Sequence, residues 1–297
     1  MTSSRTLLFT ACVGSLLAGS TVASALDTEL QGGGLGLGVD RKDYEFVLGT
    51  ELQSKQVDQG IVRNEDATQR FAGHGRFWGL GVSLDAQMAL GEDKGAGYLT
   101  KVEPTTYGSR PTKPLETTQV EIKVDYLLEI GGVYGDNEPF IQFIPHFDTI
   151  IYPNQPAGPL KDSQKYLGAD LWWATPLKGV ELGTSQDWSV GNQPAYRGAV
   201  GLREFYQAAP YDLAFWQVAN WGDKNYHNLF TGSEQGGLTT IDLGAKVTTN
   251  LLWRETWAYL RADWSYWMTK GDRDQLDLIG QDVGQLQFAI GVEWRAE

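Results

Sequence analysis

Residues 119–130 read QVEIKVDYLLEI, and their side chains alternate between apolar and charged along almost the whole stretch. One face carries Val120, Ile122, Val124, Tyr126, Leu128 and Ile130, and the other carries Glu121, Lys123, Asp125 and Glu129. A period of two predicts a β-strand whose faces meet different surroundings. Ordinary globular strands have about 5–6 residues, whereas a tilted membrane-spanning strand needs about 9–11. The stretch therefore favours a membrane-spanning strand.

The same alternation recurs along the chain after residue 43. It predicts twelve strands, with Pro145 interrupting one of them because proline cannot donate to a strand ladder. The predicted strands are 43–57, 66–73, 76–90, 118–130, 139–151, 165–174, 179–187, 194–206, 210–221, 238–249, 256–268 and 284–296.

The connections between these strands alternate in length. Short ones are expected at 74–75, 131–138, 175–178, 207–209 and 250–255, and mostly long, polar ones at 58–65, 91–117, 152–164, 188–193, 222–237 and 269–283. Outer-membrane barrels have short periplasmic turns and long external loops. The pattern predicts an all-β fold, an antiparallel up-and-down transmembrane β-barrel of about twelve strands with both ends on the short-turn side.

The first 25 residues have the features of a secretory signal peptide. Arg5 supplies a positive charge, residues 7–17 are apolar, and Ala23-Ser24-Ala25 is a small-x-small cleavage pattern. The alternative is an uncleaved N-terminal anchor. We expect residues 1–25 to be the signal and 26–297 to be one barrel domain in the outer membrane of a Gram-negative bacterium. Residues 26–43, which include a Gly-rich stretch, could add a further strand.

Composition excludes several classes of protein. Lys and Arg number 24 against 37 Asp and Glu, a net charge of −13, which argues against a nucleic-acid partner. The only uncharged run long enough to span a membrane as a helix is 6–26, nearly all of it within the predicted signal, so a helical bundle is excluded. Cys12, the one cysteine, also lies there. The mature chain therefore has no disulfide, thiol nucleophile or cysteine-ligated metal.

Alternation alone also fits a soluble β-sandwich, which has one apolar and one polar face on each strand. Charge and glycine occur together on the polar faces here, as in a narrow wet lumen. Aromatic residues lie near the predicted strand ends, as an interfacial girdle requires: Tyr44, Trp78, Trp173, Trp188, Tyr211, Trp221, Trp257 and Trp294. A periplasmic carbohydrate-binding sandwich remains the soluble alternative.

Two short segments carry a family resemblance. The first strand ends in SKQVDQGI at residues 54–61, and Ile150-Ile151-Tyr152-Pro153 is followed by QKYLG at 164–168. In this the chain resembles the Gcw_chp family of bacterial outer-membrane proteins over about residues 44–222. That family usually has Arg before Gly-Ile, where this chain has Gln59. The resemblance implies an outer-membrane barrel and no particular activity.

Residues for catalysis or metal binding are few. His74 is expected in a tight turn, His146 in a strand beside Pro145, and His227 in a long loop. The alternative hypothesis is an outer-membrane enzyme that acts on lipid, with His227, Ser233 and Glu234 as its catalytic group. Residues 272–277 have acidic spacing reminiscent of a calcium loop, but Leu276 occupies a ligand position and the glycine is missing. We expect no enzyme, no catalytic residues, no metal site and no cofactor.

The polar faces of the strands define the candidate site, the lumen. Its predicted lining is Asp85, Glu121, Lys123, Asp125, Glu129, Asp242, Lys246, Arg261, Asp263, Glu293 and Arg295. Two readings stay open: a small passive, porin-like channel that mildly favours cations, or a structural barrel filled by paired charges. Folding the last hairpin about residue 276 predicts Tyr259 opposite Glu293 and Arg261 diagonal to Glu293. The expected partners are outer-membrane lipid and small solutes or cations.

Overall fold

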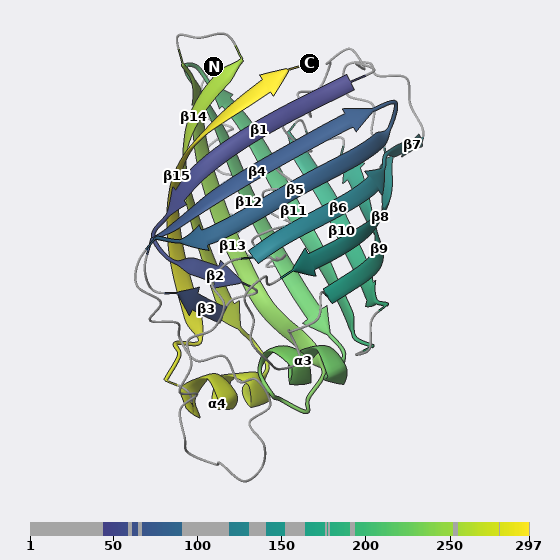
Figure 1. The fold of residues 1–297 in the computed structure, drawn as a ribbon, viewed down its shortest axis with the longest axis vertical. Coiled ribbons are helices and arrows are strands. Elements are labelled where there is room, and N and C mark those ends of the chain that lie inside the picture. Colours follow the sequence, from purple (N-terminus) through teal and green to yellow (C-terminus); the bar gives the residue numbers. More distant parts are fainter. Residues whose placement is uncertain are drawn as a thin grey trace, which may run out of the picture.

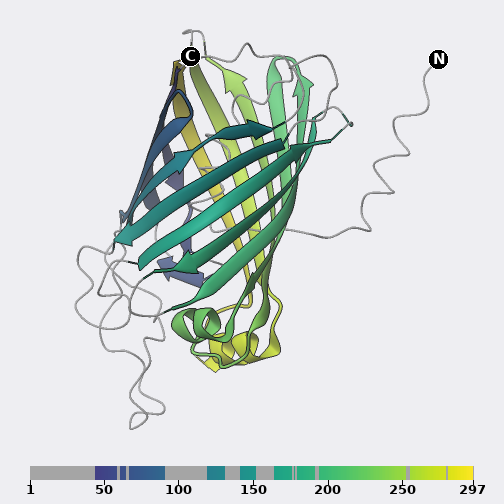
Figure 2. The ribbon, with the colours of Figure 1, turned by 90° about the vertical axis from the view of Figure 1, so that its right-hand side faces the viewer.

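The computed structural model describes residues 44–58, 61–64, 67–90, 119–130, 141–151, 164–175, 177, 179–190, 194–251, 255–278 and 280–296. The predicted signal peptide and the question of an extra strand in 26–43 lie outside these residues. The described chain is a closed antiparallel β-barrel of twelve strands (Figures 1 and 2). A closed barrel excludes the two-sheet sandwich.

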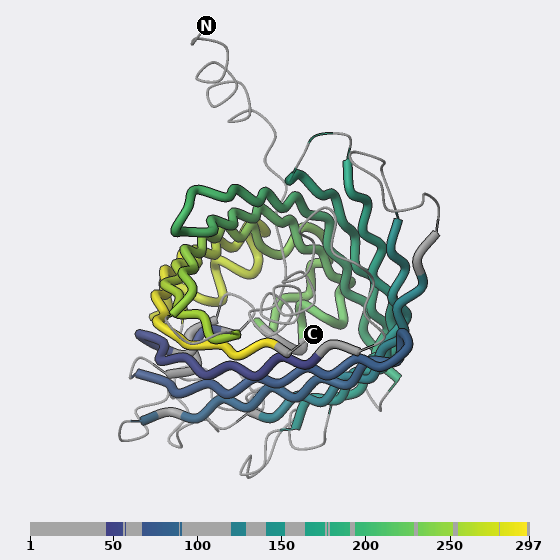
Figure 3. The backbone as a smooth tube through the Cα atoms, turned by 90° about the horizontal axis from the view of Figure 1, so that it is seen from above, coloured from purple at the N-terminus to yellow at the C-terminus, as the bar shows by residue number. Residues whose placement is uncertain are grey.

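The strands follow the predicted order. They are β1 (Tyr44–Gln53), β4 (Thr68–Phe77), β5 (Leu80–Ala89), β6 (Gln119–Tyr126) with β7 (Leu128–Ile130), β8 (Ile141–Ile151), β9 (Gln164–Ala174), β10 (Val180–Ser189), β11 (Tyr196–Ala208), β12 (Tyr211–Gly222), β13 (Gly237–Asn250), β14 (Thr256–Trp267) and β15 (Gly284–Ala296). Each pairs with its chain neighbours, and β1 pairs with β15 to close the ring, seen end-on in Figure 3.

Segments β6 and β7 are two parts of one strand. Both pair with β8 in the same register, Asp125 opposite His146 and Leu128 opposite Phe143. The ladder lapses where Tyr126 would face Pro145, because proline has no N–H to donate. The predicted interruption of strand 139–151 does not occur within β8, which runs unbroken from Ile141 to Ile151 with Pro145 paired to Ala169 of β9. The lapse is confined to the β6–β7 side and does not move the register.

The connections define two ends of the barrel. At the turn end, the joints are short, and β1 begins and β15 finishes there. At the loop end, the chain forms a small hairpin of β2 (Gln56–Asp58) and β3 (Ile61–Asn64) and two short helices, α3 (Lys224–Phe230) and α4 (Lys270–Leu278), below the barrel in Figure 1. Neither helix, nor any other in the described residues, is long and apolar enough to cross a membrane.

The first hairpin corrects one prediction. The turn between β4 and β5 is Trp78-Gly79, where both residues have positive φ (47° and 86°), and not the Gly73-His74-Gly75 segment. Two-residue hairpin loops favour this left-handed geometry because it matches the twist of the strands. Gly73 and Gly75 lie inside β4, under the side chains of Leu48 and Phe46 of β1. His74 is therefore a strand residue with its side chain buried.

The outer and inner faces reverse the usual distribution of a soluble protein. Outward positions on the strands carry large apolar side chains that are 37% exposed or more, and inward positions carry buried polar and charged ones. On β5, for example, Leu80, Val82 and Leu84 are each at least half exposed, whereas Ser83 and Gln87 between and beyond them are buried. The buried interior of this barrel is polar.

The predicted aromatic girdle is mostly on the outer face. Trp78, Trp173, Trp188, Tyr211 and Trp294 are 38–69% exposed. Trp221, which lines the cavity, and Trp257 are exceptions. Trp257 lies opposite Glu293, and Arg295 lies over its ring at 5.4 Å, so it faces inward. The prediction for Trp257 was wrong because it considered only the nearness of this residue to a strand end. In the alternation of β14, Trp257 lies on the same face as Tyr259 and Arg261, which point inward. The Tyr44 side chain lies outside the described residues.

Candidate functional site: the lumen

Ten of the predicted lumen residues have inward-facing side chains in the described structure. They are Asp85, Glu121, Lys123, Asp125, Asp242, Lys246, Arg261, Asp263, Glu293 and Arg295. The side chain of Glu129 lies outside the described residues. These groups do not form a single lining. They fall into a densely packed half and a half that borders a cavity.

The packed half is built around Glu51 of β1. Its Oε1 lies 3.3 Å from Nη1 of Arg70 and 3.0 Å from Nη2 of Arg261, and its Oε2 accepts a hydrogen bond of 2.9 Å from the hydroxyl of Tyr259. Arg70 also donates from Nε to Asp85 at 2.7 Å. Because Glu51, Arg70 and Arg261 are at most 2% exposed, water is excluded here and the charges neutralise one another. We call these residues, together with Asp263, the Glu51 cluster.

A second group of charges lies nearer the turn end. Lys246 Nζ is 3.2 Å from Glu293 Oε2, Arg295 also contacts Glu293, and Lys246 lies 4.2 Å above the ring centre of Tyr259. Glu293 thus has two cationic partners from β13 and from its own strand. Arg261 is not one of them, since it bonds to Glu51 and lies 2.7 Å from Asp263.

The predicted pairing of Arg261 with Glu293 was therefore wrong. The hairpin of β14 and β15 is centred on residue 275, so Tyr259 lies opposite Gly291 and Arg261 opposite Ala289. A shift of one residue in the centre moves every partner by two positions. Each side chain therefore keeps its face of the strand but has a different neighbour across the ladder. For this reason Arg261 and Glu293 both point inward as predicted, although they are not paired with each other.

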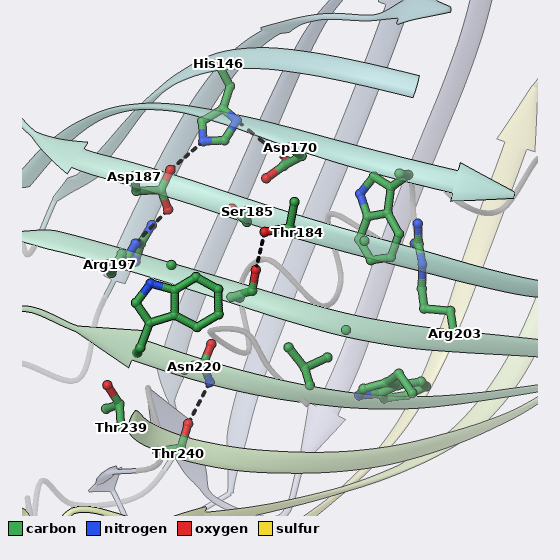
Figure 4. Close-up of a pocket in the computed structure, with 18 of the residues that line it drawn as sticks. His146, Asp170, Thr184, Ser185, Asp187, Arg197, Arg203, Asn220, Thr239 and Thr240 are labelled. Carbon is green, nitrogen blue, oxygen red and sulfur yellow. Dashed lines mark hydrogen bonds and ion pairs between the residues drawn. The ribbon is translucent and has the colours of Figure 1, made fainter. Parts of the chain in front are cut away.

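The other half of the lumen borders a cavity, enclosed mainly by β6 and β8 to β13 (Figure 4). It encloses about 1200 Å³, the part open to solvent included. One wall is charged and internally paired. His146 Nε2 lies 2.7 Å from Asp187 Oδ1, Arg197 donates from Nε to Asp187 Oδ2 at 2.8 Å, and Lys123 lies 3.3 Å from Asp170.

The adjoining wall, on β11 and β12, carries an apolar patch. Ala199, Val218 and Trp216 pack together there, and all three line the cavity. The Trp216 ring lies over Gly244 of β13, and on the far side the Trp172 ring lies over Gly183 of β10. The missing side chain at each glycine leaves room for a ring to lie along the wall. Arg203 covers the Trp172 ring, with its guanidinium carbon 3.5 Å from the ring centre.

Two atoms of the charged wall have hydrogen-bonding capacity to spare. Among the described residues, Oδ1 of Asp148 and Nη1 of Arg197 are buried without a hydrogen-bond partner. The two side chains face each other, with Arg197 Nη2 3.7 Å from Asp148 Oδ2. One is an acceptor and the other a donor, and both border the cavity.

The lumen contains several residues that the sequence analysis did not select. Glu51, Arg70, Asp148, Asp170, Asp187 and Arg197 are all inward and charged. Their strands alternate less cleanly than 119–130, because threonine, glycine and glutamine occupy some outward positions, as in Thr50 and Gln186. Extending the period of two through these interruptions would have identified them.

Each of the three histidines has its own polar neighbours among the described residues. His74 Nδ1 is 3.0 Å from Ser83 Oγ, and His146 belongs to the charged wall. His227 lies in α3, and its partner is Asp272 of α4, with Nδ1 2.6 Å from Oδ2. Ser233 bonds to neighbouring backbone, and Glu234 forms an exposed ion pair with Lys224. The alternative grouping of His227 with Ser233 and Glu234 was therefore wrong.

The His227–Asp272 pair ties the two helices at the loop end together. Both side chains have 0% exposure. Asp272 also accepts from the Thr231 hydroxyl, and Thr239 Oγ1 lies 3.3 Å from His227 Nε2, so strand β13 is included in the contact. The stretch with calcium-like spacing is thus part of helix α4, with Asp272 turned to His227 and Leu276 buried. We call His227, Thr231, Thr239 and Asp272 the cap contact.

No protein-family model and no curated protein matches the sequence, so the resemblance to the Gcw_chp family stays a prediction. Solved structures with a similar backbone include the KdgM porin (10% identity, TM-score 0.45, 84% of this chain and 98% of that chain). The NanC porin has 10% identity and TM-score 0.48 over the same shares. An outer-membrane channel from Pseudomonas putida F1 has 7% identity and TM-score 0.46 over 88% and 98%. At these values the likeness does not extend to function.

Proposed function

We propose that this chain is an outer-membrane β-barrel that acts as a narrow, porin-like channel for small polar solutes. The observation that carries the proposal is the reversal of its faces, apolar outside and charged inside, on a closed ring of long strands. Extended apolar surface is unfavourable in water and favourable against lipid. The strands of 10 to 14 residues also suffice to cross a bilayer.

Two features support passage through the lumen. The cavity occupies the half bordered by β6 and β8 to β13, whereas the Glu51 cluster fills the opposite half, so a passage would run off-centre along the cavity side. The aromatic rings that line it lie along the wall over glycines, which keeps them out of the central space. A channel of this kind is narrow and selective by size.

The charge of the lumen supports a mild preference for cations. Inward acids outnumber inward bases among the described residues, but most are paired, which leaves a weak net field. The acids are Glu51, Asp85, Glu121, Asp125, Asp148, Asp170, Glu181, Asp187, Asp242, Asp263 and Glu293, and the bases are Arg70, Arg76, Lys123, Arg197, Arg203, Lys246, Arg261 and Arg295.

Membrane fractionation followed by planar-bilayer recording tests the proposal. The protein should pellet with the outer membrane and migrate differently on gels before and after boiling. In bilayers it should open small channels whose reversal potential in a salt gradient indicates cation preference. Anion preference would contradict the acidic lumen. A barrel that inserts and never conducts would establish the structural reading, in which the paired charges fill the lumen.

A further inference from the structure

The cavity has two unlike walls whose combination restricts what can bind between them. The wall on β11 and β12 presents Ala199, Val218 and the ring of Trp216. The wall on β6 and β8 to β10, with Arg197 of β11, presents ion pairs. A purely apolar ligand would leave Asp148 Oδ1 and Arg197 Nη1 of the charged wall buried without hydrogen-bond partners, which is unfavourable.

Ions also fit poorly. Two carboxylates of the charged wall already face bases: Asp187 faces His146 and Arg197, and Asp170 faces Lys123. A bound cation would have to compete with those bases, and a bound anion with those acids. A small cation or anion would therefore gain few new contacts on this wall.

The spare hydrogen-bonding atoms indicate a different kind of ligand. Asp148 Oδ1 can accept and Arg197 Nη1 can donate, and the two groups are on the same wall. A hydroxyl group can donate to the first and accept from the second without carrying charge. A molecule with several hydroxyls on one side and C–H groups on the other would satisfy both walls, since C–H groups pack well on an indole face.

We propose that the cavity binds a neutral polyhydroxylated molecule of sugar size, with its C–H face on Trp216 and its hydroxyls toward Asp148 and Arg197. The cavity is lined by side chains of β6 and β8 to β13, so a ligand bound in it would contact both walls. The inference rests on the proposed channel function for the route by which the ligand reaches the cavity.

Saturation-transfer NMR on the refolded barrel in detergent micelles tests this site directly. The probes are glucose and maltose, with glucuronate and glucosamine as charged counterparts. Glucose and maltose should receive saturation, strongest at ring C–H protons, and the charged sugars should receive less. Trp216→Leu should weaken binding by about fivefold to tenfold. The matched control Trp173→Leu, on the outer face of β9 where Trp173 is 40% exposed, should leave binding unchanged.

A second variant guards against misfolding of the first. Asp148→Asn keeps the size of the side chain and removes its charge, and it should also weaken glucose binding. Preferential binding of glucuronate or glucosamine, no saturation of any sugar, or equal losses with Trp216→Leu and Trp173→Leu would each overturn the proposal. Conductance is recorded separately. Sugar binding without conductance would support the sugar site and contradict the proposed channel function. Conductance without sugar binding would support the channel function and contradict the sugar site.

Discussion

The indole ring of Trp216 on β12 occupies the space directly above Gly244 on β13, its partner in the strand register. A Cβ atom at residue 244 would overlap the ring. The glycine is therefore what allows the largest side chain of the apolar wall to lie along the barrel. The same relationship holds between Tyr259 and Gly291, so it is a repeated way of fitting rings inside this barrel.

Gly244→Ala should destabilise the barrel by about 1–3 kcal/mol, because the Trp216 ring must move off the wall. The measurement is urea unfolding of the refolded protein, followed by its gel mobility without boiling. Gly49→Ala is the matched control: Gly49 is on β1, and an added Cβ there meets only ordinary contacts at 3.7 Å. Equal effects of the two substitutions would show that the Trp216 ring is not confined by Gly244.

Glu51→Gln should cost about 3 kcal/mol or more, because it leaves Arg70 and Arg261 buried without their shared carboxylate. Chemical unfolding again provides the free energy. Glu204→Gln removes a charge whose only described hydrogen bond is an exposed one with Tyr206, and it should change stability by about 0.5 kcal/mol or less. A small loss at Glu51 would mean that the packed half is hydrated.

A double-mutant cycle tests the corrected register of the last hairpin. Glu293→Gln and Lys246→Met should be coupled by about 0.5–3 kcal/mol, because the two side chains are in contact at 3.2 Å. Glu293→Gln and Arg261→Met should show a much smaller coupling. The reverse order would support the pairing expected from folding the hairpin about residue 276.

Leu260→Arg should impair insertion into lipid by about 2–4 kcal/mol if residue 260 lies near the bilayer midplane. Leu260 is 59% exposed in the middle of β14. Leu278, which is 74% exposed at the end of α4 beyond the strands, is the matched leucine, and Leu278→Arg should insert normally. The yield of heat-modifiable protein in vesicles gives the comparison, and equal tolerance would place both leucines in water.

Asp272→Asn should loosen the cap contact without unfolding the barrel, because it weakens the tie between α3 and α4 while the strands keep their ladders. Trypsin should then cut near Lys270 and Arg273 faster than in the unaltered protein. Glu234→Gln, which removes only the exposed pair with Lys224, should leave the cutting rate unchanged. An unaltered rate in Asp272→Asn would show that other contacts hold the helices.

The sequence determines the faces of the strands more strongly than it determines partners. Alternation in 119–130 and its repeats located all twelve strands, because lipid and lumen impose opposite chemistry on successive residues. It could not show that Arg261 meets Glu51, since these residues are 210 positions apart and their contact depends on ring closure. It also missed the meeting of His227 with Asp272, which depends on two loops folding toward each other. The turn at Trp78-Gly79 was hidden by a more glycine-rich segment nearby.

The position of Glu51 has a consequence for how the chain assembles. Glu51 belongs to the first strand of the ring, Arg261 to the next-to-last, and the strand that pairs with both is the last, β15. In an open sheet Glu51 lies on one edge strand and Arg261 lies one strand in from the other edge, so their attraction contributes nothing until the ring shuts. Stabilisation from this pair therefore arrives in the final step, and partly zipped sheets gain nothing from it. The Glu51–Arg261 pair therefore makes closure of the ring between β1 and β15 more cooperative. A wrong pairing of β1 during assembly gains no stabilisation from this pair.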